Sequence, residues 1–275
     1  EIKEENNFER LLDEISRYAP SEIIANEMLY NCSEEISKIK ERFDVYISTE
    51  EEEKFSEEID NLYNQYEILC DNGEKLKDLE QRLFAVSAIN GLIQYIEDTQ
   101  KTKLEHINKI IIYTITKYMA LDINARRNLE LTEKLRDKSK KGTLLWVLDK
   151  TATSMGGRLL RRWISDPLID VFEVNNRLDA VKELKEDVMM RGELVSSLKG
   201  VYDIERLAGK VSYGSANARD LNSLKASAKK LPEIKKLIEN SKSNMLRNLY
   251  QDLDELEDIY TLIENAIIED PPISV

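Results

Sequence analysis

Histidine, cysteine, glycine and proline are all scarce in this chain, whose 275 residues include one His, two Cys, nine Gly and five Pro. So few glycines and prolines argue against an all-β protein, which places a turn about every ten residues. Cys32 and Cys70 form no CxxC pair and His106 stands alone, so the donors lack the spacing of a zinc site. We therefore expect a helix-rich protein with reduced thiols, no metal site and a cytoplasmic location.

Long apolar runs are also absent. No run approaches the ~18 residues that span a membrane, and the N-terminus lacks the apolar stretch of a signal peptide. We therefore expect no membrane partner. The chain begins at Glu1 without an initiator Met, and we expect it to be a piece of a longer protein.

Sequence motifs for catalysis are missing as well. No segment has the GxxxxGK[ST] spacing that holds nucleotide phosphates, so we expect no ATP, Mg²⁺ or other cofactor to bind this chain. A catalytic triad would have to use His106 at the start of a predicted strand, where a structural role is the better interpretation. Carboxylates are abundant, but abundance alone supplies no paired acid and base in a pocket. We expect no catalytic residue here and no enzyme activity.

Charge is what the chain has in excess: 34% of its residues are charged and its net charge is −13. The excess is uneven, because residues 1–100 have a net charge of −16, residues 101–250 of +11 and residues 251–275 of −8. A reversal of this size indicates two differently employed units, and a polyanion could bind the basic stretch. Solvated helix faces of differing composition are an equally good interpretation.

The first part of the chain mixes helices with strands. Hydrophobic spacing, caps and turn residues predict helices over 8–15, 33–43, 79–96 and from 50 onward, strands over 22–30, 107–113 and 114–121, and a turn at 71–73. The first hundred residues thus contain a single predicted strand. One strand cannot form a sheet, so we expect its partners to precede Glu1.

From Asp122 the pattern is helical almost to the end. It predicts helices over 154–164, 171–186, 188–198, 203–210 and 218–231, with Pro232 restarting or kinking the last. Seven apolar residues then follow at alternating spacings of 3 and 4: Leu246, Leu249, Leu253, Leu256, Tyr260, Ile263 and Ile267. This pattern predicts one unbroken helix, about 35 Å long at ~1.5 Å per residue, packed against partner helices.

One basic helix face is a candidate for binding nucleic acid. In the helix that begins near Ser154, the guanidinium groups of Arg158, Arg161 and Arg162 lie on the arc opposite the apolar residues. Three such groups can bind phosphates, although pairing with the acidic N-terminal stretch is at least as good an interpretation. Gly156 lies within the apolar arc, so we expect it to pack against another helix rather than to cradle a phosphate.

Specific motifs occur in order along the chain. In the second half, D-x-x-[TA]-x-R-N-L-E-L occupies Asp122–Leu131, G-[ST]-L-x-x-x-L-D occupies Gly142–Asp149, and T-x-x-G-x-R-x-L-x-x-W-[LI]-x-x-P-L occupies Thr153–Leu168. They are followed by Asn176–Val181, Asp203–Leu207 and Asp270–Pro272, and preceded by Pro20–Ile24, Leu92–Gln100 and Leu104–Ile107. Together these segments resemble the MutS family of DNA mismatch-repair proteins. The earlier segments resemble its connector domain and the later ones its core domain.

The resemblance implies a mostly α fold, in which an α/β connector remnant of RNase H-like type (residues 1–112) precedes an all-α lever core (residues 113–275). It also implies a piece of a mismatch-recognition ATPase that couples nucleotide state to a DNA clamp without catalysis of its own. In the longer protein, ATP and Mg²⁺ are the expected cofactors. The expected partners are mismatched duplex DNA, a MutL-like repair protein and a second copy of the chain.

The family's catalytic and base-contacting residues have no counterpart in this sequence, so none is carried over. The family uses a Phe-x-Glu tripeptide to stack on a mispaired base, and Phe55-Ser56-Glu57 has the same spelling. That tripeptide lies within a run of acidic residues that would repel DNA, so we interpret it as a coincidence.

Two other classes of function stay open. The first is an acidic helical adaptor that binds a protein outside mismatch repair, which a pull-down without any repair protein would favour. The second is a helical enzyme that uses two carboxylates. It requires a pocket in which Asp or Glu residues shift one another's pKa.

Overall fold

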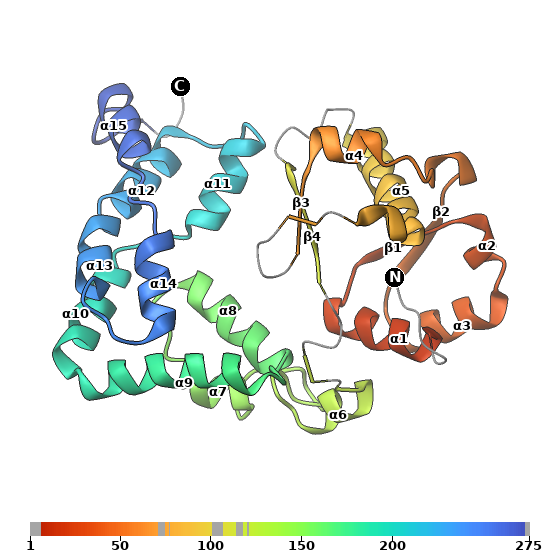
Figure 1. Cartoon of the computed structure of the whole chain (residues 1–275), viewed down its shortest axis with the longest axis horizontal. Coiled ribbons are helices and arrows are strands. Elements are labelled where there is room, and N and C mark those ends of the chain that lie inside the picture. Colours follow the sequence, from red (N-terminus) through yellow and green to blue (C-terminus); the bar gives the residue numbers. More distant parts are fainter. Residues whose placement is uncertain are drawn as a thin grey trace. The chain divides into compact units, whose positions relative to one another are not determined.

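The chain divides into two compact units. The computed structural model describes residues 7–70, 75–76, 78–100, 107–113, 118–119 and 121–272, so His106 and the predicted turn at 71–73 lie outside the described residues. Residues 1–116 and 120–125 belong to an N-terminal unit, and residues 117–119 and 126–275 to a helical unit. The first contains all four described strands, whereas the second is built from helices (Figure 1). This confirms the predicted fold class.

The N-terminal unit alternates short helices and strands. Its elements are α1 (Asn7–Tyr18), β1 (Glu22–Ala25), α2 (Glu27–Tyr30), α3 (Ser33–Arg42), β2 (Tyr46–Thr49), the 3₁₀ turn η1 (Glu52–Lys54), α4 (Asp60–Gln65), β3 (Glu67–Cys70), the 3₁₀ turn η2 (Leu79–Gln81), α5 (Leu83–Gln100) and β4 (Lys109–Ile112). β1 pairs in parallel with β2, and β3 in parallel with β4. Each pair has its own apolar core, one around Leu12 and Ile39 and the other around Leu62 and Val86.

The expectation of a single strand in the first hundred residues was wrong. β2 and β3 are only four residues long and show too little alternation to stand out from the surrounding helical pattern. Tertiary contacts make them strands: Ile47 and Ile68 are buried, and they pair with Ile23 and Ile110 in the parallel registers. The strand predicted at 107–113 is confirmed as β4. Of the strand predicted at 114–121, the structure describes only 118–119 and 121.

The first predicted strand is also shorter than expected. β1 ends at Ala25 because the side chain of Asn26 accepts a hydrogen bond from the backbone N–H of Leu29, at 3.1 Å, and thereby caps α2. The acidic run at 50–53 opens a 3₁₀ turn rather than an α-helix.

The Phe-x-Glu tripeptide packs on α5. A Cβ atom on Gly91 would lie 2.6 Å from two carbons of the Phe55 ring, so the ring contacts the helix backbone directly. The buried amide of Asn90 donates hydrogen bonds to the carbonyl oxygens of Ser56 and Glu58, at 2.8 and 3.0 Å. Phe55 is therefore an anchor for the loop after η1, which is consistent with its Phe-x-Glu spelling being a coincidence.

The helical unit holds the rest of the chain. Its elements are α6 (Ile123–Asn128, shared with the N-terminal unit), α7 (Leu144–Leu148), α8 (Ser154–Ser165), α9 (Val171–Glu186), α10 (Val188–Leu198), α11 (Ile204–Ser212), α12 (Ala218–Ala228), α13 (Leu231–Ile238), α14 (Asn244–Asp252) and α15 (Glu257–Ala266). The predicted helices from 154 to 198 match α8, α9 and α10 closely. Pro232 lies in the first turn of α13, so it restarts the helix as predicted.

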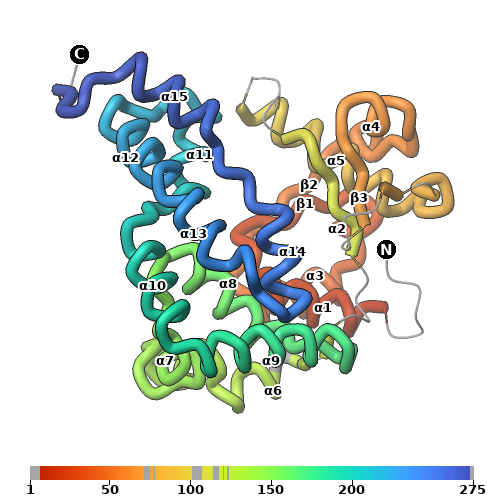
Figure 2. Tube along the Cα trace, turned by 60° about the vertical axis from the view of Figure 1, so that its left-hand side comes forward, coloured from red at the N-terminus to blue at the C-terminus, as the bar shows by residue number. Residues whose placement is uncertain are grey.

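The chain returns on itself within this unit. α10 packs on α9 and α13, α13 on α12 and α14, and α14 on α9 again, while α15 covers α12 (Figure 2). Ala180 of α9, Ile238 of α13 and Leu246 of α14 form the buried core of this arrangement. Segments about sixty residues apart in the sequence therefore hold one another in place.

The unbroken C-terminal helix was a wrong prediction. The helix stops at Asp252, and α15 starts only after Leu256, a non-glycine residue with a left-handed φ of 53°. Acidic residues explain the break, because Asp252 opposes the negative end of α14 whereas Glu257 suits the positive end of α15. Lys235 supports the break by donating a hydrogen bond to the carbonyl oxygen of Leu253, at 2.7 Å.

We expect Gly91→Ala to destabilise the N-terminal unit by about 1–3 kcal/mol, because the new methyl group overlaps the Phe55 ring. In a Phe55→Ala background the same change should instead stabilise α5 by roughly 0.5–1 kcal/mol, the helix-propensity gain of Ala over Gly. Urea denaturation of the four chains of this double-mutant cycle measures both effects. Equal effects in the two backgrounds would show that Phe55 does not contact Gly91.

Candidate nucleic-acid interface

The start of α8 is fixed by the loop before it. Thr153, rather than Ser154, caps the helix by accepting a hydrogen bond from the N–H of Gly156 at 3.1 Å. A Cβ on Gly156 would meet the side chains of Thr153 and Thr151, at 3.1 and 3.4 Å. The prediction that Gly156 packs against another helix was therefore wrong. The glycine makes room for the capping loop.

Arg158 is engaged within the helical unit. Its guanidinium donates hydrogen bonds to both carboxylate oxygens of Asp203, at 2.7 and 2.8 Å, and to Glu205, at 2.6 Å. The Ser154 hydroxyl also donates to Asp203. The Arg158 guanidinium holds the pKa of Asp203 far below its usual range, against the opposing effect of burial. This bidentate pairing joins the start of α8 to the start of α11.

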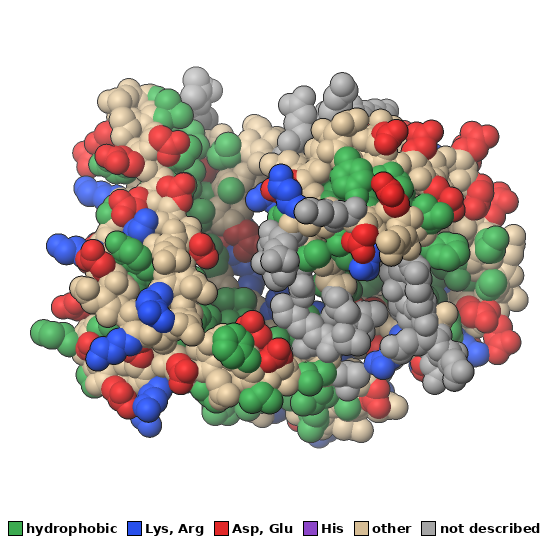
Figure 3. Space-filling view, in the orientation of Figure 1, with side chains coloured by type: hydrophobic (Ala, Val, Ile, Leu, Met, Phe, Trp, Pro, Cys, Tyr) green, Lys and Arg blue, Asp and Glu red, His purple; other side chains and the backbone are tan. Residues whose placement is uncertain are grey.

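Arg161 and Arg162 are in a different situation. Both side chains are exposed on α8, and within the described ranges neither makes an ion pair or side-chain hydrogen bond. On the face shown in Figure 3, acidic side chains crowd the N-terminal unit, while Lys and Arg are interspersed on the helical unit. Of the three candidate arginines, these two are the ones whose guanidinium groups are free to meet phosphates.

The far end of α8 is held by two further arginines. The Arg177 guanidinium lies 3.7 Å from the centre of the half-buried Trp163 ring, and burial lowers the pKa of Arg177. Arg126 donates a hydrogen bond to the carbonyl oxygen of Ser165 at 2.7 Å and lies 3.5 Å from the buried Asp166 carboxylate. With Arg158 at its start, α8 is fixed at both ends, so Arg161 and Arg162 project from a rigid support.

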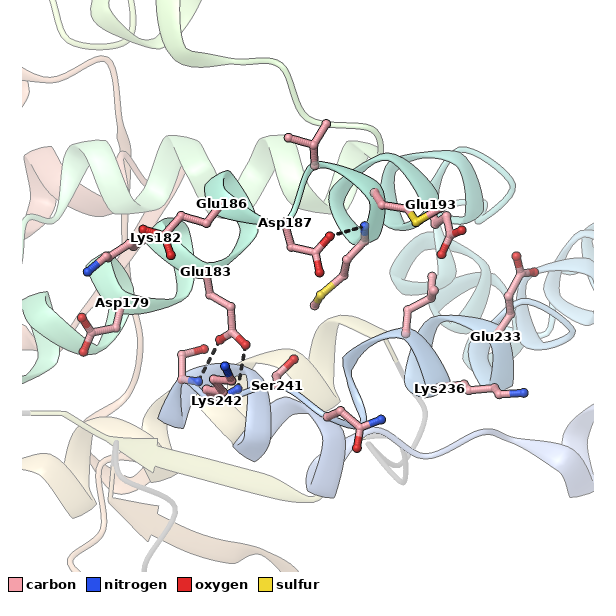
Figure 4. A pocket seen from close by; sticks show the side chains of 16 residues that line it. Asp179, Lys182, Glu183, Glu186, Asp187, Glu193, Glu233, Lys236, Ser241 and Lys242 are labelled. Atoms are coloured by element: carbon pink, nitrogen blue, oxygen red, sulfur yellow. Dashed lines mark hydrogen bonds between the residues drawn. The ribbon is translucent and has the colours of Figure 1, made fainter.

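A separate open pocket of about 1150 Å³ lies between α9, α10 and α13 (Figure 4). It is lined by six carboxylates and three lysines: Asp179, Glu183, Glu186, Asp187, Glu193, Glu233, Lys182, Lys236 and Lys242. Several of these carboxylates accept hydrogen bonds that stabilise the fold. Asp187 caps α10 by accepting from the N–H of Met190, at 2.9 Å.

Glu183 has the most extensive role in this pocket. Its carboxylate accepts hydrogen bonds from the backbone N–H groups of Lys242 and Ser243, at 2.7 and 2.8 Å (Figure 4). Burial disfavours its ionised form, but these hydrogen bonds outweigh burial and hold the pKa of Glu183 below its ordinary value. An α9 side chain thus occupies the start of α14.

Two carboxylates of this pocket, Glu183 and Glu233, have pKa values that neighbouring donors lower. Hydrogen bonds from the Ser197 hydroxyl and the Lys230 ammonium lower the pKa of Glu233. Glu233 and Glu183 are thus both ionised at neutral pH, whereas a general acid needs a raised pKa.

Among the described residues there is no cluster of three or more His, Cys, Asp or Glu that could hold a metal ion. No helix in the described part of the chain is long and apolar enough to cross a membrane.

Comparison with known protein families agrees with this architecture. A model described as MutS domain II matches residues 1–108, and a model described as MutS domain III matches residues 124–275. An α/β unit followed by a helical unit is thus the connector-and-core arrangement that the motifs suggested. The chain belongs to the MutS family, as the resemblance predicted.

Individual relatives give the same result. The DNA mismatch repair protein MutS of Ruminiclostridium cellulolyticum is 49% identical over 98% of this chain and 30% of its own length. The protein of the same name from Acetivibrio thermocellus is 46% identical over 98% of this chain and 31% of its own length. The chain therefore spans about 30% of the length of the curated relatives it matches.

We expect Glu183→Gln to cost about 1 kcal/mol at pH 7, because it removes the charged acceptor that binds the N–H groups of Lys242 and Ser243 just before α14. Folding lowers the Glu183 pKa, so its carboxylate stabilises the fold above its ordinary pKa of 4.5, and this contribution is lost as the pH falls through the lowered value. Urea denaturation between pH 7 and 3 should show the cost shrinking with pH.

The matched control for this prediction is Glu186→Gln, which changes an exposed carboxylate on the same helix. It should have little effect at any pH in this range. A cost for Glu183→Gln that is the same at pH 3 as at pH 7 would contradict the assigned role of the carboxylate.

Proposed function

We propose that this chain is part of a DNA mismatch-repair protein, in which the N-terminal unit connects domains and the helical unit relays conformational change. The observation that carries the proposal is the collinear similarity, over 98% of this chain, to relatives named DNA mismatch repair protein MutS. In this proposal an ATPase and a DNA clamp lie elsewhere in the longer protein. The helical unit couples the nucleotide state of the first to the second.

The packing of the helical unit supports a mechanical role. Contacts between α9 and α14 and between α12 and α15 close the chain on itself, and Arg158, Asp203 and Glu205 join α8 to α11. A body tied by such long-range contacts moves as a unit and transmits displacement with little bending. Because the chain breaks before α15, the helical unit ends in two short helices, α14 and α15, rather than in one long helix.

The chemistry of this proposal lies outside the chain. ATP and Mg²⁺ would bind the longer protein, whose partners would be mismatched duplex DNA, a MutL-like repair protein and a second copy, in the cytoplasm. The part played by this chain is positional. Its contribution to DNA binding would come from exposed basic side chains such as those of Arg161 and Arg162.

We expect the isolated chain to hydrolyse no ATP and to bind mismatched and fully paired duplexes equally. The sequence has no phosphate-binding loop with its Lys, and such a loop is needed to hold the β- and γ-phosphates with Mg²⁺. Reading a mispair requires entering and bending the duplex, for which Phe55, packed on Gly91, is not available. Phosphate-release assays and duplex titrations test both statements. ATP turnover that survives repurification, or a clear preference for the mismatch, would contradict them.

We expect weak, sequence-independent duplex binding that falls steeply with salt, and we expect Arg161→Gln with Arg162→Gln to reduce the salt dependence. Each lost phosphate contact lowers the slope of log K against log salt by about 0.9, so the double change should lower it by nearly 2. Arg158→Gln is the matched control, because Asp203 and Glu205 already hold that guanidinium. Anisotropy titrations at several salt concentrations measure the slopes. An equal loss from Arg158→Gln would contradict the assignment.

A further inference from the structure

The short helix α7 exposes most of its apolar side chains. Of its five residues, only Leu145 is buried. Leu144, Trp146, Val147 and Leu148 are each between 45% and 57% exposed. Four large apolar side chains exposed on one short helix, spread over the arc that faces away from Leu145, are more than the single exposed residues that are normal on a protein surface. In Figure 2, α7 lies at the edge of the helical unit.

α7 is nevertheless held rigidly. Thr143 is buried and caps it by accepting a hydrogen bond from the N–H of Trp146, at 3.2 Å. The N–H of Leu145 donates to the carbonyl oxygen of Leu131, at 2.9 Å. Lys140, before the helix, forms an ion pair with Asp149, after it. The apolar face is thus presented in a fixed orientation, which lowers the entropy that a binding partner must overcome.

The rim of this helix is basic. Lys141 precedes the cap of α7 and Lys150 follows its end, and both side chains are exposed. Arg136, in the loop before the cap, is exposed as well. Within the described part of the chain these three bases make no ion pair or side-chain hydrogen bond, whereas Asp149, the acidic residue next to Lys150, is already paired with Lys140.

We propose that α7 and its basic rim, here called the α7 patch (Leu144, Trp146, Val147 and Leu148 with Arg136, Lys141 and Lys150), bind an acidic amphipathic helix of a partner protein. Apolar residues of that helix, spaced 3 and 4 apart, cover the four exposed side chains, and flanking Glu or Asp residues meet the three bases. Nucleic acid fits less well, because sugar and phosphate groups do not cover Leu and Val side chains. α7 is about 7.5 Å long at ~1.5 Å per residue, which matches one to two turns of the partner helix.

Trp146 gives this patch its own reporter. The chain has two Trp residues, and the other one, Trp163 of α8, lies against Arg177 of α9. In the full chain with Trp163→Phe, the emission of Trp146 alone reports whether the patch becomes covered. The probe is a synthetic helical peptide with Leu at positions i, i+3, i+4 and i+7 and Glu at the flanking positions. A peptide with Lys in place of Glu is the charge-reversed control.

The proposal predicts a saturable blue shift of Trp146 emission with the Glu peptide, weakened by salt, and at least roughly tenfold weaker binding of the Lys peptide. Lys141→Glu with Lys150→Glu should weaken binding of the Glu peptide by a similar factor and improve binding of the Lys peptide. Lys199→Glu with Lys236→Glu makes the same charge change at other exposed positions and should change neither. Val147→Asp should abolish binding while circular dichroism shows the fold intact.

Three results would overturn the proposal. One is equal binding of the Glu and Lys peptides, which would mean non-specific apolar adhesion. Another is an equal effect of the two lysine pairs, which would mean a general charge effect. The third is a blue shift with an oligothymidine strand that the Glu peptide cannot displace, which would make the α7 patch a nucleic-acid surface instead.

Discussion

The helical unit depends on one half-buried carboxylate. Glu183 of α9 accepts hydrogen bonds from two consecutive backbone N–H groups about sixty residues later, at the start of α14. Lys242 and Ser243 lie just before the first turn of α14, so this side chain satisfies two loop donors and fixes the point at which the chain enters the helix. Everything between these two points, α10 to α13, is thereby enclosed in a loop of packed helices. The core of Ala180, Ile238 and Leu246 lies where that loop closes.

The same principle explains which elements could be predicted. α8, α9 and α10 have local signals: Asp170 and Asp187 cap their helices, and the chain turns at Pro167. β2 and β3 have almost none, because four residues become a strand only when a parallel neighbour from elsewhere in the chain lies beside them. The heptad spacing from Leu246 to Ile267 is real, but the acidic residues around Leu253 and Leu256 end one helix and begin the next. Apolar spacing therefore predicted the buried Leu246 and Ile263, but it predicted neither the exposure of Leu249 nor the break in the backbone.

The candidate interface was predictable to a similar degree. Helical spacing correctly put Arg158, Arg161 and Arg162 on α8, but spacing carries no information about partners. Asp203, forty-five positions after Arg158, binds the Arg158 guanidinium. Arg161 and Arg162 are therefore the two candidates whose guanidinium groups remain available for phosphates. For Phe55 the sequence already indicated the correct interpretation, because its acidic neighbours argued against DNA binding. The contact of its ring with Gly91 becomes apparent only in the fold. Membership of the MutS family came from motifs, since physical reasoning alone gave only a helical protein with a charge reversal.

The most direct test of this account is hydrogen exchange at the backbone amides of Lys242 and Ser243, compared with amides in the middle of α9. If the Glu183 carboxylate closes the helical unit, these two loop amides should be protected nearly as strongly as the α9 amides, and all should lose protection together as urea is added. Exchange at 242 and 243 as fast as in an exposed loop, with α9 still protected, would show that the two segments are not joined and that the unit does not move as one body.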